Sequence, residues 1–269
     1  MLLSTLLAAL DAGAIPVSDR VDPDPEVMRV VHDSRVVEPG DLFCCIPGAH
    51  HDGHDHVEQA VEAGATAVLA EHPVASDAPV VIVQSVRQTM PLLAAAAVGD
   101  PSHDLRVVGV TGTNGKTSVA HMLAGVLDSL GRRSEAIGTL SGIRTTPEAP
   151  EFQRCLAAWS REGVECVVAE VSSHALAQHR VDGTRFSGVA FTNLGRDHLD
   201  YHATMEEYAA AKDRLFNPTF TDKAVIVVDD QAGRLQADRA TAAGLEVVEV
   251  STNSANALVE RQRVEVSWR

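Results

Sequence analysis

One stretch of the sequence combines the residue types that bind phosphate. Residues 111–118 are Thr-Gly-Thr-Asn-Gly-Lys-Thr-Ser, and they follow the apolar run 107–110, which predicts a buried strand. Apolar residues at helical spacing then predict a helix that ends near Gly131; they are Val119, Met122, Leu123, Val126, Leu127 and Leu130. A glycine turn between strand and helix aims backbone N–H groups and the positive helix end at an anion. We expect Lys116 to reach the β- and γ-phosphates of a nucleotide and Thr117 to ligate Mg²⁺.

This stretch is a variant of the phosphate-binding loop and not a strict match. The strict motif has a glycine five residues before Gly115, where this sequence has Val110. The alternative is a glycine-rich connection that binds nothing. A Gly-Lys-Thr sequence at the start of a helix favours phosphate binding.

Composition bounds the class of protein. The chain has 269 residues, 45% of them hydrophobic, which is enough for one large domain or two ordinary ones. Its formal charge of −15 argues against nucleic acid as the main partner, although a local loop can still bind an anion. Four cysteines without metal spacing indicate reduced thiols in a cytoplasmic protein. No apolar stretch approaches the roughly 18 residues of a membrane span.

Alternating strand and helix patterns predict an α/β protein with two units. Residues 1–100 form the first, which opens with a helix whose apolar face carries Leu2, Leu3, Leu6, Leu7 and Leu10. A breaker-rich linker over 99–104 leads to the second unit, 105–269, a mostly parallel sheet that opens with the phosphate loop.

A histidine-rich loop in the first unit suggests metal binding. Residues 50–56 contain four histidines in seven positions. No predicted strand or helix fixes the ligand geometry that metal sites need, so we favour a solvated loop that precedes a helix over 57–63.

Polar residues follow three apolar strands of the second unit. They are the phosphate loop, the run 170–174, and the run 193–198. Ligands of open α/β sheets bind beyond the carboxyl ends of strands, so these three places should meet. Glu170 is then a carboxylate suited to Mg²⁺. His198 is a candidate second metal ligand or a phosphate contact, although each residue alone could be an ordinary loop or capping residue.

Several motifs, in order from about residue 30 to about residue 230, resemble the Mur ligases and in particular the MurE type. The loop 111–118 resembles their ATP loop. The runs 170–176, 178–181, 192–202 and 211–216 resemble the MurE type, and 33–35, 39–43 and 52–54 resemble the family's N-terminal UDP-binding domain.

The resemblance implies an ATP-dependent amide ligase of peptidoglycan precursor synthesis. ATP would phosphorylate the D-glutamyl carboxylate of UDP-MurNAc-L-Ala-D-Glu, and a diamino acid would then attack the acyl phosphate. ATP would be held by Gly112, Thr113, Asn114, Gly115, Lys116, Thr117 and Ser118. The UDP-sugar peptide would be held by Ser34, Thr145, Thr146, Ser172, Gln178 and Arg180.

The same resemblance implies the catalytic and metal residues. Lys116, Glu170, His198 and Lys212 would be catalytic, and Thr117, Glu170 and His198 would serve Mg²⁺. Lys212 matches a lysine that the family carbamylates, which turns an ammonium into an anion able to support Mg²⁺. The alternative is a solvated helix lysine; the chain has only two others, Lys116 and Lys223.

The family has a third, C-terminal domain, and the chain stops at Arg269, inside or just after the central domain. We therefore expect a fragment or a truncated ligase, and we expect it to be a monomer. A non-catalytic module that binds nucleotide or UDP-sugar, or an inactive fragment, is the alternative. The sequence does not distinguish meso-diaminopimelate from L-lysine as the incoming amino acid.

Overall fold

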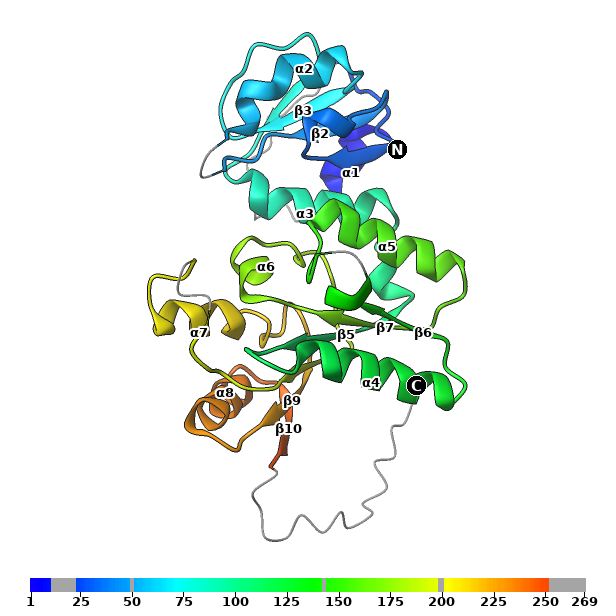
Figure 1. The fold of residues 1–269 in the computed structure, drawn as a ribbon. Coiled ribbons are helices and arrows are strands. Elements are labelled where there is room, and N and C mark those ends of the chain that lie inside the picture. Colours follow the sequence, from blue (N-terminus) through cyan, green and yellow to red (C-terminus); the bar gives the residue numbers. More distant parts are fainter. Residues whose placement is uncertain (11–22, 49–50, 142–143, 198–200, 252–269) are drawn as a thin grey trace.

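The computed structural model describes residues 1–10, 23–48, 51–141, 144–197 and 201–251. They form two α/β units stacked end to end, each built on its own sheet (Figure 1). All the strand pairs that were assigned within the two sheets are parallel, as the alternating pattern predicts. None of the helices in these ranges is both long and apolar enough to cross a lipid bilayer.

The first unit is a four-stranded sheet with strand order β1-β2-β3-β4. Its elements are α1 Leu3–Ala8, β1 Arg29–Val31, β2 Asp41–Cys44, α2 Val57–Glu62, β3 Ala67–Ala70, β4 Val80–Ile82 and α3 Val86–Ala97. The central strands β2 and β3 are buried along their whole length, which is why both are near-continuous apolar runs in the sequence.

The second unit is a six-stranded sheet with strand order β10-β9-β8-β5-β7-β6. Its elements are β5 Arg106–Thr111, α4 Lys116–Ser129, β6 Ser134–Ile137, α5 Ala149–Arg161, β7 Cys166–Glu170, α6 Ser173–Ala177, β8 Gly188–Phe191, α7 Met205–Asp213, β9 Lys223–Val227, α8 Gln231–Ala242 and β10 Glu246–Val250. The chain leaves β5 toward β6 and β7, and later builds β8, β9 and β10 on the other side. This reversal beside β5 is the place where open α/β sheets bind ligands.

Strand register brings the three predicted polar places together. Val110 of β5 is paired with Glu170 of β7, and Thr111 of β5 is paired with Phe191 of β8. The loops after these strands therefore begin at the same level of the sheet.

Helices cover both faces of the second sheet. On one face, Ala120, Ala124 and Leu127 of α4 pack on Val110 and Val168. On the other, a larger cluster joins α5, through Phe152 and Leu156, with α8, through Ala237 and Ala240. The predicted apolar stripe of α4 is too wide, because Met122, Val126 and Leu130 are exposed on its outer face.

Several elements were not predicted from the sequence. Among them are β1, β6, the short α6 and α8. Helix α8 buries mainly small side chains, Gly233, Ala237 and Ala240, so its buried face lacks the large aliphatic residues that make a helical period visible. It begins at Asp230, whose side chain accepts the Gly233 N–H at 2.7 Å.

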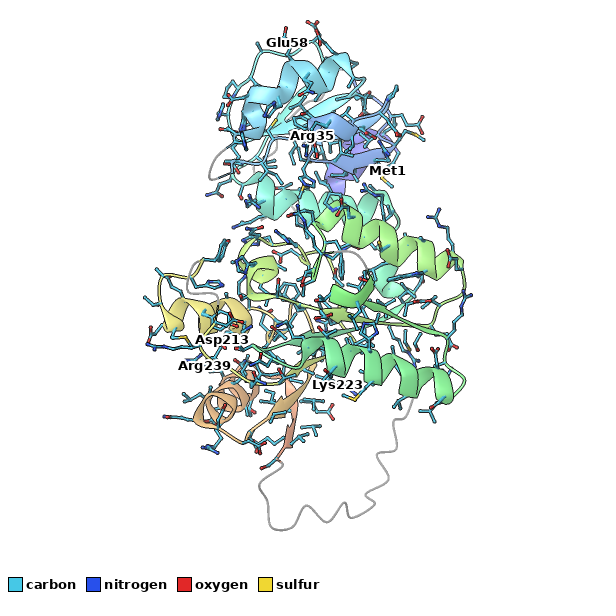
Figure 2. The ribbon with its side chains drawn as sticks, in the orientation of Figure 1. Met1, Arg35, Glu58, Asp213, Lys223 and Arg239 are labelled. Carbon is cyan, nitrogen blue, oxygen red and sulfur yellow. The ribbon has the colours of Figure 1, made fainter. Side chains whose placement is uncertain are left out.

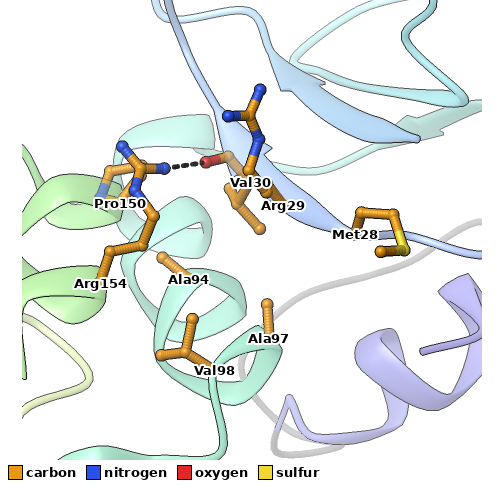
Figure 3. A pocket seen from close by; sticks show the side chains of 8 residues that line it. All are labelled: Met28, Arg29, Val30, Ala94, Ala97, Val98, Pro150 and Arg154. Atoms are coloured by element: carbon orange, nitrogen blue, oxygen red, sulfur yellow. Dashed lines mark hydrogen bonds between the residues drawn. The ribbon is translucent and has the colours of Figure 1, made fainter. Parts of the chain in front are cut away.

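Helices α3 and α5 lie side by side between the two sheets (Figure 1). Ala149, at the start of α5, belongs to the apolar cluster of the first unit. Figure 3 shows Arg154 of α5 reaching across a small pocket to donate to the Val30 carbonyl of β1 at 3.3 Å. The first unit is thus packed directly on the helix that follows the loop 144–148.

At the other end of the second unit, Asp213 and Arg239 lie next to each other (Figure 2). They form an ion pair between the end of α7 and α8. Helix α7 is therefore joined to the body of the sheet domain through its last turn as well as through its buried side chains.

Candidate functional site

The phosphate loop adopts a conformation that needs glycine at two positions. Gly112 has φ +148° and Gly115 has φ +86°. A Cβ atom on Gly112 would lie 1.9 Å from Thr192 Oγ1, so no larger residue fits there. Gly115 is the N-cap of α4, and the first N–H groups of that helix have no partner inside it. These N–H groups and the helix dipole make the loop a phosphate cradle.

The end of β8 holds this loop from the side. Asn193 accepts the Thr113 N–H through its carbonyl at 2.9 Å and the Asn114 N–H through its side-chain oxygen at 3.0 Å. Thr192 Oγ1 donates to the Asn114 carbonyl at 2.6 Å. No role was predicted for Asn193, although its position at a strand end was a usable signal.

Two lysine amines converge on one carbonyl of the loop. Lys116 Nζ donates to the Gly112 and Thr113 carbonyls, each at 2.9 Å. Lys212 Nζ donates to the same Gly112 carbonyl at 2.9 Å. Burial lowers the pKa of Lys116, against the opposing influence of Glu170 and Asp197. A nucleotide at this loop would require Lys116 to exchange these carbonyls for phosphate oxygens.

Lys212 lies in the protein interior and not in solvent. Only 1% of its surface is exposed, and its Nζ is 4.4 Å from the ring centroid of Tyr208, one turn earlier on α7. Burial and the nearby Lys116 lower the pKa of Lys212 to about 7, against the opposing charge of Asp197. Tyr208, whose hydroxyl is 3.1 Å from Thr113 Oγ1, fixes this lysine against the phosphate loop. No function was predicted for Tyr208 from its place in the sequence.

Glu170 and Thr117 form a pair of oxygen ligands beside the loop. Thr117 Oγ1 donates to Glu170 Oε2 at 2.7 Å, and the Thr139 N–H donates to Glu170 Oε1 at 2.8 Å. Glu170 is 1% exposed. A hydroxyl and a carboxylate at hydrogen-bonding distance are the hard oxygen donors that Mg²⁺ prefers, so these two residues fit the ion. The third predicted ligand, His198, lies outside the described residues.

A cleft runs from the phosphate loop toward the first unit. It is lined by Lys116, Thr117, Thr139, Arg144, Thr145, Thr146, Glu170, Ser172, His174 and Arg180. Seven of these residues were predicted from the sequence for nucleotide, metal or substrate. His174 belongs to the motif 170–176 but received no role, and no role was predicted for Arg144 or Thr139. The cleft joins cationic side chains to a metal-type carboxylate, which suits a substrate with several negative charges.

Arg180 is the most strongly held cation of this cleft. It pairs with Glu148 at 2.8 Å, donates to the Thr146 carbonyl at 3.0 Å, and donates to Gln178 Oε1 at 2.6 and 3.1 Å. Burial lowers its pKa, with Glu148 opposing the shift. The predicted ligand Gln178 therefore contacts Arg180 and, through its amide nitrogen, the Tyr201 hydroxyl at 3.2 Å.

The hydroxyl groups of two other predicted substrate residues, Thr146 and Ser34, form hydrogen bonds within the protein. Thr146 is 1% exposed; its hydroxyl donates to the Glu170 carbonyl at 2.8 Å and accepts the Ser172 N–H at 3.1 Å. It fixes the end of β7, whereas Thr145 borders the cleft with a more open side chain. Ser34 lies in the first unit, where it donates to Gln59 Oε1 at 2.8 Å, and it is not among the residues that line the cleft.

The histidine loop of the first unit is more ordered than the sequence indicated. His54 has a side chain only 5% exposed, its Nδ1 is 2.5 Å from Asp52 Oδ1, and its Nε2 accepts the Glu71 N–H at 3.0 Å. It also stacks on His72 with centroids 4.1 Å apart. Because both ring nitrogens of His54 have partners, its contacts are structural, although Asp52, His54 and His72 lie close enough to form a metal-type cluster.

Comparison with known protein families identifies this architecture. The profile of the Mur ligase middle domain matches residues 110–269, and the profile of the Mur ligase family catalytic domain matches residues 26–102. The middle-domain match covers more than half of the chain. The chain therefore belongs to the Mur ligase family, as the motifs predicted.

Individual relatives agree with the family assignment. The chain is 47% identical over 202 residues to a UDP-N-acetylmuramoyl-L-alanyl-D-glutamate--2,6-diaminopimelate ligase of Geobacillus thermodenitrificans, covering 72% of this chain and 41% of the relative. A solved structure of a ligase with the same name has a TM-score of 0.77 and 30% identity, covering 86% of this chain and 49% of that one. MurF from Acinetobacter baumannii shares the fold, with a TM-score of 0.65 and 21% identity over 92% of this chain and 52% of that one.

The chain spans about half the length of the curated relatives it matches, between 41% and 49% for those compared. The similarity covers the phosphate loop, the cleft and the helix that carries Lys212. It therefore supports a function for these sites more directly than for a whole ligase.

Proposed function

We propose that this chain supplies the ATP site and the UDP-sugar peptide site of a ligase of peptidoglycan precursor synthesis. The observation that carries the proposal is the meeting of Lys116 and the Thr117–Glu170 pair in one cleft, with the buried Lys212 donating to the same Gly112 carbonyl as Lys116. The names of the relatives supply the substrates, UDP-N-acetylmuramoyl-L-alanyl-D-glutamate and 2,6-diaminopimelate.

The first chemical step in this proposal activates a carboxylate. The D-glutamyl carboxylate attacks the γ-phosphorus of ATP, the bond from that phosphorus to the bridging oxygen of ADP breaks, and an acyl phosphate forms. Lys116 and the N–H groups at the start of α4 neutralise charge on the transferring group. Bound Mg²⁺ would be held by Thr117 and Glu170 and supplies further neutralisation of the phosphates.

The second step forms the amide. The amine of the diamino acid attacks the acyl carbon, phosphate leaves, and the amine loses a proton. Phosphorylation is needed because a free carboxylate is a poor electrophile and has no adequate leaving group. Within the described residues, the cleft supplies cations for the substrate through Arg144 and Arg180. The first unit, packed on α5, would hold the UDP end near Ser34.

Lys212 is suited to carbamylation, which requires a neutral amine. A pKa lowered to about 7 leaves much of this buried amine unprotonated near neutral pH. The Nζ atom attacks CO₂, a C–N bond forms, one C–O π bond becomes an oxyanion, and a proton leaves to solvent. The resulting carbamate exchanges a positive charge for oxygen atoms beside the phosphate loop, where Mg²⁺ favours them.

The proposal is tested by trapping the acyl phosphate. The chain is incubated with ATP, Mg²⁺, UDP-MurNAc-L-Ala-D-Glu and hydroxylamine, and hydroxamate and ADP are measured. We expect both products in equal amounts, with neither formed by Lys116→Ala. The matched control is Lys223→Ala, which removes an exposed lysine of β9 and should leave the yield unchanged.

The outcomes separate the candidate functions. Binding of ATP and UDP-MurNAc-L-Ala-D-Glu without hydroxamate would favour the non-catalytic binding module. Failure of both ligands to bind, with the chain folded, would refute the proposed function. Amide formation with diaminopimelate but not L-lysine would extend the amino-acid preference in the relatives' name to this protein.

A further inference from the structure

The short turn after α6 joins two parts of the site that lie on different elements. Arg180 points to the loop 144–148, where it contacts Thr146 and Glu148, and Gln178 accepts a hydrogen bond from Arg180. Between them, His179 has φ +60°, a left-handed conformation that is unusual for a residue with a Cβ. Such strain persists only where the surroundings stabilise it. This backbone conformation lets the adjacent side chains of His179 and Arg180 point in different directions, one toward α7 and the other toward the loop 144–148.

His179 turns away from the cleft and toward α7. Its Nδ1 lies 2.6 Å from Asp182 Oδ2 and 3.0 Å from Arg214 Nη2. The Asp182 carboxylate also accepts from Arg214 Nη2, at 3.1 and 3.3 Å for its two oxygens. The three side chains are largely shielded, with 21%, 18% and 31% of their surfaces exposed. Shielded, charge-assisted contacts of this kind are stronger than isolated surface pairs.

Arg214 connects this cluster to the nucleotide site. It is the C-cap of α7 and lies two residues after Lys212, whose Nζ contacts the Gly112 carbonyl. The loop 144–148 is therefore linked to the phosphate loop through Arg180, the strained turn, Arg214 and α7. Each link is a direct contact or a short run of chain.

We propose that His179, Asp182 and Arg214 are positioning residues that couple the UDP-sugar cleft to the nucleotide site. A ligand that holds Arg180 would stabilise the turn in the conformation that ties down α7. Lys212 and Tyr208 would then be fixed against the phosphate loop before the nucleotide arrives. Coupling between two sites is reciprocal, so each ligand should tighten the other by the same factor. This inference rests on the proposed function of the two sites.

The test measures that factor by calorimetry. The non-hydrolysable analogue AMP-PNP with Mg²⁺ is titrated into the chain with and without saturating UDP-MurNAc-L-Ala-D-Glu. We expect about tenfold tighter binding in its presence, within the range typical of coupled sites. Arg214→Gln and Asp182→Asn should reduce the factor to below about twofold, because each breaks the contact between turn and helix.

Two variants separate positioning from general damage. Arg214→Lys retains a cation opposite Asp182 and should keep most of the coupling. His179→Gly relieves the left-handed backbone while removing the ring, so it should fold well and still lose coupling. The matched control is Arg132→Gln, which breaks an ion pair with Glu165 at the opposite edge of the sheet and should keep the full factor.

The results distinguish this inference from the proposed function. Full coupling in Arg214→Gln and His179→Gly would overturn the inference, as would two ligands that bind the parent chain independently. Failure of the parent chain to bind either ligand would instead count against the proposed function. Loss of coupling in these variants, with retention in Arg214→Lys and Arg132→Gln, would establish the positioning role.

Discussion

Replacing the buried Lys212 should stabilise the protein in a pH-dependent way. Burial, together with the Lys116 charge, lowers the pKa of Lys212 from 10.5 to about 7. This difference corresponds to about 5 kcal/mol of unfavourable free energy for holding the charged amine in the folded state. Lys212→Met shortens the side chain by one heavy atom, keeps it unbranched and removes the charge.

The sign follows from proton binding. Between about pH 7 and 10.5 the unfolded chain holds a proton on Lys212 that the folded chain has released, so stability rises with pH by about 1.4 kcal/mol per pH unit. Below about pH 7 both states hold the proton and the full penalty remains. Above 10.5 neither state holds it, and the penalty disappears.

The expected gain is largest in acid. The variant also loses the hydrogen bond to the Gly112 carbonyl, which reduces the expected gain in stability by about 1 kcal/mol. Lys212→Met should therefore be more stable than the parent by about 4 kcal/mol at pH 6 and by about zero at pH 10. Urea unfolding in CO₂-free buffers at several pH values measures the difference. Lys223→Met, at an exposed lysine, is the control and should show no such trend.

A stability difference that stays constant from about pH 6 to pH 10 would refute this account of Lys212. The same variant tests carbamylation. At about pH 8 a lysine with a pKa of about 7 is about ten-elevenths neutral, whereas one with an ordinary pKa is neutral about once in 300 molecules. With ¹³C-bicarbonate, NMR should show a carbamate signal in the parent chain and none in Lys212→Met.

Three further predictions concern the same sites. Lys116→Ala should lower hydroxamate formation at least a hundredfold, by about 3 kcal/mol or more, in a single-turnover assay, because charge on the transferring phosphoryl group is left unneutralised. Gly138→Ala should raise the Mg²⁺ concentration needed for nucleotide binding, because its Cβ would lie 1.9 Å from Glu170 Oε1 and would displace that carboxylate. The control Gly125→Ala has open space around its Cβ and should instead stabilise α4 by roughly 0.5–1 kcal/mol in urea unfolding. UDP-MurNAc-L-Ala-D-Glu should raise the melting temperature in a thermal-shift experiment, glucose should not, and Arg180→Ala should remove most of the shift.

Much of the architecture was predictable because it is encoded locally. The glycines and Lys116 predict the phosphate loop, and apolar runs bounded by breakers predict most strands of both sheets. The carboxyl-end rule predicted that Glu170 would meet the phosphate loop, and strand register places Glu170 opposite Val110. Helix α8 was not predicted, because the small buried side chains Ala237 and Ala240 do not produce a visible helical repeat of apolar residues in the sequence.

The sequence by itself determined the family, the parallel α/β class and the phosphate loop, since each depends on residues close together along the chain. Only the tertiary structure decided the state of single side chains. The side chains of Thr146 and His54 are buried because groups distant in the sequence form hydrogen bonds with them. Thr146 Oγ1 donates to the Glu170 carbonyl, and His54 Nε2 accepts the Glu71 N–H. Lys212 acquired a pKa of about 7 because folding removes its amine from water and places Lys116 beside it. Desolvation and charge proximity are properties of packing, and no local pattern records them.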